Sequence, residues 1–272
     1  MQRTTLAGTS LEVSRLGLGT ASLHHLIRRR DREALLRTAL DCGITHFDTA
    51  RMYGEGGAER TLGRYLGSTR QHITLATKFG IPAVPLLERA PWLIYPQRVF
   101  ARLGRKAWAR LDSERRRCVT QSCLERSVRS SLQALRTDWI DILFVHEPLV
   151  AEVESLLSLA EYLDRLRREG TIRHFGLAGR AADCIAVAEQ SGDLFDVLQV
   201  EDSLEGREAD LLKEAGLHMQ ITYGYLRRAA EAAAGADASE VIGKALERNA
   251  AGCVLVSSRR PERLRALATL AD

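Results

Sequence analysis

Four ionisable side chains lie at or just beyond the ends of short apolar segments. Asp48 and Tyr53 follow one such segment, Lys78 ends a second and His146 ends a third. A tyrosine serves as a general acid when its pKa falls from about 10 toward neutrality, and a nearby ammonium can lower it. We expect Lys78 to supply that charge, Asp48 to keep the lysine protonated, and His146 to hydrogen-bond a carbonyl oxygen. Such a set would polarise or protonate that oxygen while another group attacks the carbon.

Each of these residues also has a purely structural interpretation. A strand-end aspartate often caps a helix, and a lone lysine often extends its ammonium to solvent. A single tyrosine is commonly half-buried packing, and a histidine before Glu147 and Pro148 is compatible with a turn. The catalytic interpretation therefore depends on a fold that brings the four side chains together.

Short apolar segments alternate with amphipathic segments from Leu16 onward. The expected strands are 16–19, 45–48, 73–77, 140–145, 172–176, 197–200, 219–223 and 253–256. The expected helices are 32–42, 58–66, 123–135, 153–169, 181–190, 207–215, 239–249 and 261–271. This alternation predicts an α/β fold, a (β/α)8 TIM barrel, which routinely spans about 250 residues as one domain. We therefore expect residues 1–272 to form a single barrel domain, with the polar strand ends at its C-terminal rim.

A doubly wound open sheet is the alternative fold for this alternation. Its dinucleotide site usually shows G-x-G-x-x-G directly after the first strand. Here the first strand leads into the run from Gly17 through Gly19 to Ser22, in which the third glycine is absent. The barrel is therefore favoured.

Two segments depart from the repeat. Residues 4–7 and 11–13 alternate in polarity and predict an N-terminal β-hairpin that closes the base of the barrel. Residues 79–120 form a long irregular loop after the third strand, and such loops at this end of a barrel are usually functional. We expect three aromatic residues of this loop to form walls of a rather apolar substrate pocket: Trp92, Tyr95 and Trp108.

Composition argues against several other classes of protein. The charged residues nearly balance, at a net charge of +4, and the basic cluster at 102–117 has no aromatic RNA-binding motif, so we expect no nucleic-acid partner. No apolar run has the length of a membrane span or signal peptide, which predicts a cytoplasmic protein without membrane association. We expect a monomer or a small homo-oligomer. The five cysteines are odd in number and lack zinc-site spacing, so we expect all five to be reduced.

Several segments together carry a resemblance to a known family. They are residues 43–55, 58–63, 77–79, 138–148, 169–176, 198–200, 223–224 and 260–264. In this order they cover most of the chain, and the sequence resembles the aldo-keto reductase family. The resemblance implies a catalytic tetrad of Asp48, Tyr53, Lys78 and His146. It also implies hydride transfer between C4 of a nicotinamide and the carbonyl or alcohol carbon of a small molecule, with the proton from Tyr53.

The resemblance further implies a nicotinamide site beside the tetrad. Tyr223 would stack on the nicotinamide, and Gln199 would hydrogen-bond its carboxamide. Thr20 and Ala21, which follow the first strand, would line the same pocket.

A phosphate site is expected at the start of the last helix. Ser258, Arg259 and Arg263 lie there, and helix N–H groups with arginines suit a phosphate, including the 2′-phosphate of NADPH. We therefore expect NADPH as the cofactor, with NADH as the second choice.

The sequence departs from the family pattern at several cofactor positions. Ala178 and Gly179 stand where the family commonly has Ser-Asn to hold the carboxamide. Ser257 replaces a common lysine, and Leu267 replaces a cofactor-binding asparagine. We therefore expect weaker cofactor binding than in a typical member. These changes also leave a second hypothesis, a barrel that binds or regulates with little turnover, whereas the intact tetrad favours the enzyme.

Overall fold

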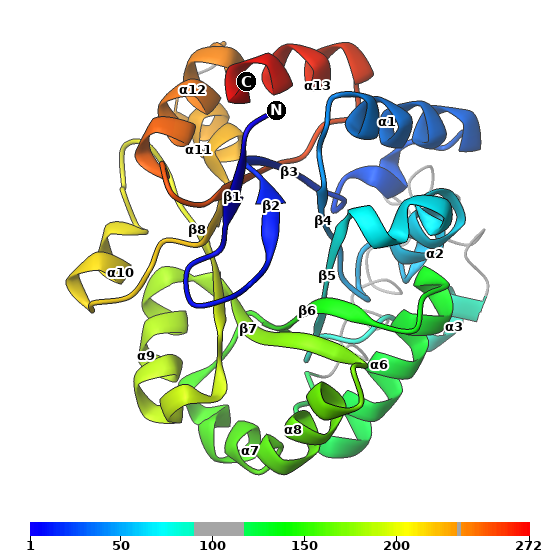
Figure 1. The fold of residues 1–272 in the computed structure, drawn as a ribbon, viewed down its shortest axis with the longest axis vertical. Helices are drawn as coiled ribbons and strands as arrows, with labels where there is room; N and C mark the ends of the chain where they lie inside the picture. The colour runs from blue at the N-terminus through cyan, green and yellow to red at the C-terminus, as the bar shows by residue number, and fades with distance from the viewer. Residues whose placement is uncertain (90–116, 233–234) are drawn as a thin grey trace, which may run out of the picture.

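The computed structural model describes residues 1–89, 117–232 and 235–272 (Figure 1). Trp92, Tyr95 and Trp108, and nearly all of the basic cluster at 102–117, lie outside the described residues.

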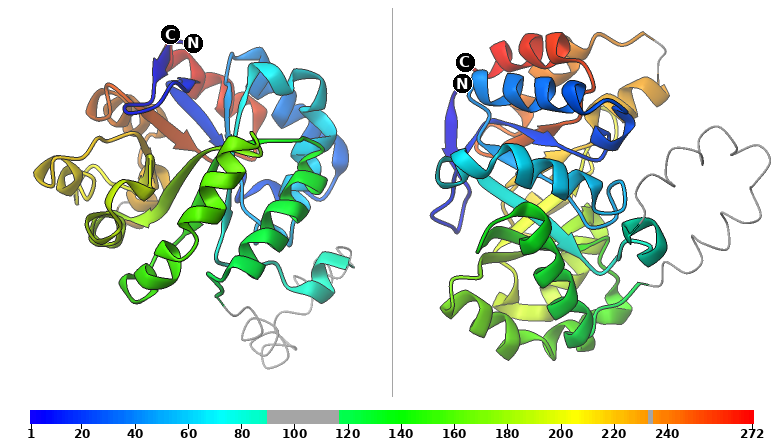
Figure 2. Two further views of the ribbon diagram at one scale, coloured as in Figure 1. Left: turned by 60° about the horizontal axis from the view of Figure 1, so that its bottom comes forward. Right: turned by 90° about the vertical axis from the view of Figure 1, so that its right-hand side faces the viewer.

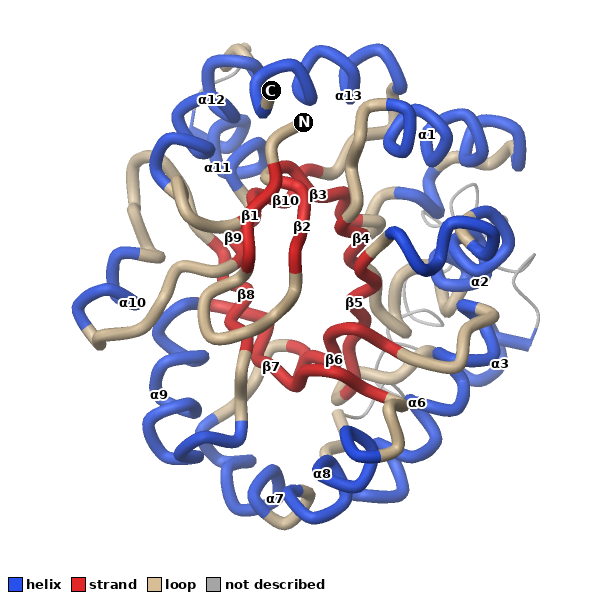
Figure 3. Tube along the Cα trace, in the orientation of Figure 1, coloured by secondary structure: helices blue, strands red, loops and turns tan. Residues whose placement is uncertain are grey.

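Eight parallel strands close into a barrel, which confirms the predicted fold (Figure 3). Around the barrel the order is β10-β3-β4-β5-β6-β7-β8-β9, so that every strand except the first and last pairs with its neighbours in sequence. The bounds are β3 Leu16–Gly19, β4 His46–Asp48, β5 Thr74–Phe79, β6 Ile140–His146, β7 Ile172–Arg180, β8 Val197–Glu201, β9 Ile221–Tyr223 and β10 Cys253–Val256.

Helices surround the barrel (Figure 1). Their bounds are α1 Arg29–Asp41, α2 Gly57–Tyr65, α3 Pro85–Arg89, α6 Gln121–Leu135, α7 Val153–Leu157, α8 Ala160–Arg168, α9 Ala181–Ser191, α10 Asp210–Glu214, α11 Tyr225–Ala232, α12 Ala238–Arg248 and α13 Pro261–Ala268. Short 3-10 helices occur at η1 Leu23–His25, η2 Gly67–His72, η4 Val150–Glu152, η5 Gly192–Leu194 and η6 Thr269–Ala271.

Burial on both faces explains why apolar residues predominate in strands such as β6. Every residue of β5 and β6 is buried, because helices cover the outer face and side chains fill the interior. Residues such as Ile142 and Phe144 meet inside the barrel, in a cluster that also includes Leu6 and Val13 from the N-terminal segment.

The predicted N-terminal hairpin is present, with β1 Arg3–Thr5 paired antiparallel to β2 Glu12–Ser14. It lies across one end of the barrel, while α3 lies at the other end (Figure 2). The side chain of Gln220 fastens it, because Nε2 donates to the carbonyl oxygens of Ala7 (2.6 Å) and Asp196 (2.8 Å).

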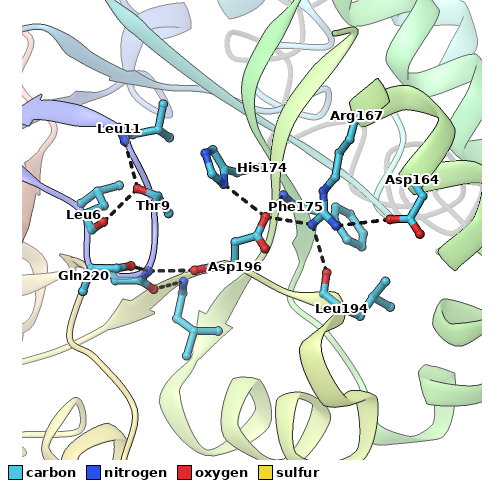
Figure 4. A network of polar contacts seen from close by, with 12 residues as sticks. Leu6, Thr9, Leu11, Asp164, Arg167, His174, Phe175, Leu194, Asp196 and Gln220 are labelled. Atoms are coloured by element: carbon cyan, nitrogen blue, oxygen red, sulfur yellow. Dashed lines mark hydrogen bonds and ion pairs between the residues drawn. The ribbon is translucent and has the colours of Figure 1, made fainter. Parts of the chain in front are cut away.

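A polar network continues from this contact along the base of the barrel (Figure 4). The Asp196 carboxylate accepts hydrogen bonds from Arg167 at 2.8 Å and, with the ring donating, from His174 at 3.2 Å. The hairpin, β7 and the segment before β8 are therefore joined by polar contacts beneath the apolar interior.

The helices differ from expectation at three places, the first being α3, which forms within the segment that was expected to be an irregular loop. The segment 153–169 is interrupted, because α7 ends at Leu157 and α8 begins at Ala160, and the hydroxyl of Ser158 donates to the carbonyl oxygen of Ser155 at 2.6 Å. Helix α11 follows β9 directly and was not predicted. It buries Tyr225 and Ala229, which lie four residues apart on one face.

The expectation that all five cysteines are reduced is wrong. Cys118 and Cys123 form a disulfide, whereas Cys42, Cys184 and Cys253 are free. Because the chain turns into α6 at Gln121, the first helical turn returns Cys123 alongside Cys118, with 6.1 Å between their Cα atoms. Among the helices that the structure describes, none is long and apolar enough to cross a membrane.

Candidate active site

The four predicted catalytic side chains line a single cavity of about 860 Å³. Asp48 is the last residue of β4, Lys78 lies near the end of β5, and His146 is the last residue of β6. Tyr53 reaches the same cavity from the loop after β4. Parallel strands place their carboxyl ends at one rim, so the barrel brings together residues nearly a hundred positions apart in sequence.

A buried ion pair lies at the floor of this cavity. The Lys78 ammonium donates to the carboxylate of Asp48 and, at 3.0 Å, to the carbonyl oxygen of Thr49. Burial lowers the pKa of Lys78 and raises that of Asp48, and each shift is opposed by the charge of the partner. A hydrogen bond from Gln199 also favours the ionised form of Asp48.

Tyr53 lies between the ion pair and His146. The Lys78 Nζ atom is 5.3 Å from the centre of the tyrosine ring, and the His146 ring meets the same ring edge-on at 5.8 Å. Burial raises the pKa of Tyr53, and the carboxylates of Asp48 and Glu147 raise it further. The expected lowering of the tyrosine pKa by Lys78 is therefore not found, because burial raises the pKa more than any other cause.

A second buried polar cluster, which was not predicted, involves residues close in sequence to Tyr53 and Lys78. Glu59, fully buried at the start of α2, pairs with Arg51. Its Oε1 atom also accepts hydrogen bonds from the hydroxyls of Thr77 and Ser131, both at 2.7 Å. The signal in the sequence was a glutamate on the apolar face of the helix at 58–66.

Arg117 stabilises the backbone at the end of β6. Arg117 donates to the carbonyl oxygen of His146 and forms a two-pronged ion pair with Glu152. This contact fixes the backbone of a tetrad residue to the end of the long loop after β5.

Most of the predicted cofactor residues line the same cavity. They are Ala21, Gln199, Tyr223, Ser258, Arg259 and Arg263. Thr20 is the exception, because it is buried and its hydroxyl donates to the carbonyl oxygen of Asp48 at 2.9 Å. It supports the strand end and does not line the cavity.

Gln199 presents an acceptor that the described residues leave unsatisfied. The side chain is 3% exposed, and among the described residues Oε1 has no hydrogen-bond partner. Buried polar atoms are normally hydrogen-bonded, so an orphan acceptor in a cavity points to a ligand donor. The N–H groups of a nicotinamide carboxamide fit this requirement.

The mouth of the cavity is positively charged. Arg259, Arg260 and Arg263 line it, and within the described part of the chain none of them pairs with a carboxylate. The Ser258 hydroxyl accepts from the backbone N–H of Arg260 at 3.1 Å, just before α13. Arginines at a helix N-terminus suit a phosphate group, so this end of the cavity fits the phosphates of a dinucleotide.

Two lining arginines were missed as cofactor candidates. Arg260 adjoins the predicted pair, and its place in the segment 260–264 was the available signal. Arg227 lies on the unpredicted helix α11 and pairs with Glu201 and Glu231.

The departures from the family pattern have clear structural positions. Leu267 is 1% exposed and belongs to the core between α13 and the barrel, so it does not contact the cavity. The Ser257 hydroxyl donates to the carbonyl oxygen of Gly19 at 3.0 Å. Ala178 lines the cavity but has no polar side-chain atom.

Known proteins share this sequence pattern. D-threo-aldose 1-dehydrogenase of Pseudomonas sp is 29% identical over 199 residues, covering 71% of this chain and 58% of that protein. NADH-specific methylglyoxal reductase of Escherichia coli is 28% identical over 237 residues, covering 81% of this chain and 66% of that protein. The chain thus spans less than two thirds of the length of either relative.

Solved structures share the fold. A putative aldo-keto reductase from Pseudomonas aeruginosa superposes with a TM-score of 0.73 at 23% identity, covering 99% of this chain and 94% of that one. The holo form of an aldo-keto reductase from Bacillus halodurans superposes with a TM-score of 0.72 at 18% sequence identity, covering 100% of this chain and 91% of that one. The model of the Aldo/keto reductase family matches residues 15–215, most of the sequence. The chain therefore belongs to the aldo/keto reductase family.

Proposed function

We propose that this protein reduces the carbonyl group of a small aldehyde or ketone with NADPH, or oxidises the corresponding alcohol. The observation that carries the proposal is one cavity that joins the buried Lys78–Asp48 pair, Tyr53 and His146 to the orphan acceptor of Gln199. When bound, the nicotinamide would supply or accept a hydride at C4.

The tetrad residues then have separate tasks. Tyr53 holds the proton at its hydroxyl, and its raised pKa keeps that proton in place until an oxygen with developing negative charge approaches. His146 orients the same oxygen by a hydrogen bond. The Lys78 ammonium, fixed by Asp48, adds a positive charge below the tyrosine ring that stabilises the developing charge.

The charged mouth supports NADPH over NADH. Three arginines without carboxylate partners in the described structure offer more positive charge than a pyrophosphate alone needs. The relative from Escherichia coli is named as NADH-specific, so the choice between NADPH and NADH has to be measured for this chain.

Calorimetric titration with NADPH and NADH tests the cofactor, and an aldehyde screen that follows nicotinamide absorbance tests the reaction. We expect saturable binding, tighter for NADPH, and turnover of small aldehydes. Tyr53→Phe should retain cofactor binding and lose about 10²–10⁴-fold in turnover. Failure of both cofactors to bind at millimolar concentration would overturn the proposal and favour a barrel that binds other ligands.

A further inference from the structure

The carboxamide side of the cavity lacks the side chains expected from the family pattern. Ala178 has no hydrogen-bonding side-chain atom and Gly179 has no side chain, although both lie at the end of β7 beside the rim. On the next strand, Gln199 pairs in register with Ala178. One acceptor, Gln199 Oε1, therefore lies on one flank of this position.

Glu147 lies on the other flank. It follows the last residue of β6, and its backbone N–H donates to the carbonyl oxygen of Ala178 at 2.7 Å. Its φ of 51° is in the left-handed region, which an ordinary residue adopts at a cost and which here turns the chain sharply after the strand.

The side chain of Glu147 reaches over Gly179. A Cβ atom built on Gly179 would lie 3.2 Å from Glu147 Oε2 and 3.2 Å from Glu147 Cα. The carboxylate therefore stands next to the position that a side chain on residue 179 would occupy. It lines the cavity together with Tyr53 and Tyr223.

This carboxylate lacks a donor in the described structure. No hydrogen bond or ion pair to its oxygens occurs among the described residues, whereas the neighbouring Glu201 is paired with Arg227. Burial and the charges of Glu201 and Asp183 raise the pKa of Glu147. The charges of Arg117 and Lys78 oppose this shift, and residue 147 is exposed at the cavity, so its carboxylate can accept hydrogen bonds from a ligand bound there.

We propose that Glu147 replaces the missing side chains at 178 and 179 and, with Gln199, holds the two N–H groups of the nicotinamide carboxamide. A primary amide presents two donors, and Gln199 Oε1 and the Glu147 carboxylate are the acceptors on the two sides of Ala178. This assignment rests on the proposed function, since it concerns a nicotinamide cofactor.

The 3-acetylpyridine analogue of NADP⁺ isolates the contact, because it keeps the pyrophosphate and the 2′-phosphate and replaces the carboxamide N–H₂ by a methyl group. Calorimetry on the full chain should show NADP⁺ binding about tenfold or more tighter than the analogue, as expected for hydrogen bonds to a charged acceptor. Glu147→Ala should weaken NADP⁺ and leave the analogue nearly unchanged, so that the ratio of the two Kd values falls.

Two further variants separate this role from a general effect of charge. Glu147→Gln keeps an acceptor oxygen but loses the charge, so its ratio should lie between those of the wild type and Glu147→Ala. Glu189→Ala removes an exposed carboxylate of α9 outside the cavity and should leave both Kd values unchanged. A wild-type ratio near one, or an unchanged ratio in Glu147→Ala, would overturn the inference alone. Absence of binding by both dinucleotides to the wild-type chain would overturn the proposed function and this inference with it.

Discussion

Glu59 Oε1 accepts a hydrogen bond of 2.7 Å from the hydroxyl of Thr77, the residue directly before Lys78. The same carboxylate pairs with Arg51, two residues before Tyr53. A single buried side chain therefore connects the two segments that carry the proposed proton donor and its ammonium neighbour.

Removal of that carboxylate should destabilise the protein strongly. Glu59→Ala leaves the buried Arg51 guanidinium with only the partly exposed Glu88 as a partner, and breaking a buried ion pair costs about 3–5 kcal/mol. Thr77→Val removes one hydrogen bond and should cost about 1 kcal/mol. Urea unfolding of the two variants measures both. Equal losses would show that the Arg51 pair contributes little.

The Lys78–Asp48 pair should behave as one unit. Lys78→Met leaves a buried carboxylate without its counterion and should cost about 3–5 kcal/mol, whereas Lys78→Met with Asp48→Asn should cost clearly less than the sum of the single changes. A double-mutant cycle from urea unfolding gives the coupling.

The exposed pair of Lys244 and Glu240 on α12 provides the control for that cycle, because both side chains are more than half exposed. It should show no measurable coupling. Additive losses at Lys78 and Asp48 would mean that the two charges are screened from one another.

Gly63 marks a close contact between α2 and α6. A Cβ atom there would lie 2.3 Å from the carbonyl oxygen of Ala134, so the helices would have to separate. Gly63→Ala should lower stability by about 1–3 kcal/mol through overpacking. Gly243, inside α12, has no atom within 4 Å of its Cβ position apart from its chain neighbours and the backbone of its own helix, and Gly243→Ala should raise stability by about 0.5–1 kcal/mol. Thermal unfolding should show a lower Tm for Gly63→Ala and a higher Tm for Gly243→Ala. A higher Tm for Gly63→Ala would contradict the close contact between α2 and α6.

Asp196 should make stability depend on acidity. Burial raises its pKa, but the hydrogen bond from His174 and the charge of Arg167 outweigh burial and hold the pKa below its usual value. The stabilisation is therefore complete above the unfolded carboxyl pKa of about 3.9 and disappears as the pH falls through the lower folded value. The Tm difference between wild type and Asp196→Asn should be largest near neutral pH. It should disappear at acidic pH. A difference independent of pH would exclude this carboxylate as the source.

The barrel and its tetrad could be predicted because strand pattern and strand end are local features. Buried parallel strands are rich in apolar residues, so Asp48, Lys78 and His146 stood out at or near the strand ends. Helix α11 was missed because its eight residues follow β9 with no separating turn, in a stretch that looked irregular.

Other features depend on neighbours that the sequence does not reveal. The Cys118–Cys123 disulfide follows from where α6 begins, and Thr20 turns its hydroxyl to Asp48 because β3 and β4 are adjacent. The pKa of Tyr53 is raised mainly because the tertiary structure buries its side chain, and then by the charge of Asp48, which lies close only in the folded chain. Glu147 was not identified because its position over Gly179 arises from a left-handed turn.

The hairpin β1–β2 lies across the end of the barrel opposite α3 (Figure 2), fastened by Gln220, whereas the four predicted catalytic side chains lie at or near the C-terminal ends of the strands. Structural integrity and chemistry are thus assigned to separate ends of one scaffold. Under the proposed function, substitutions at the rim would change which molecules react, while the contacts at the opposite end continue to stabilise the fold.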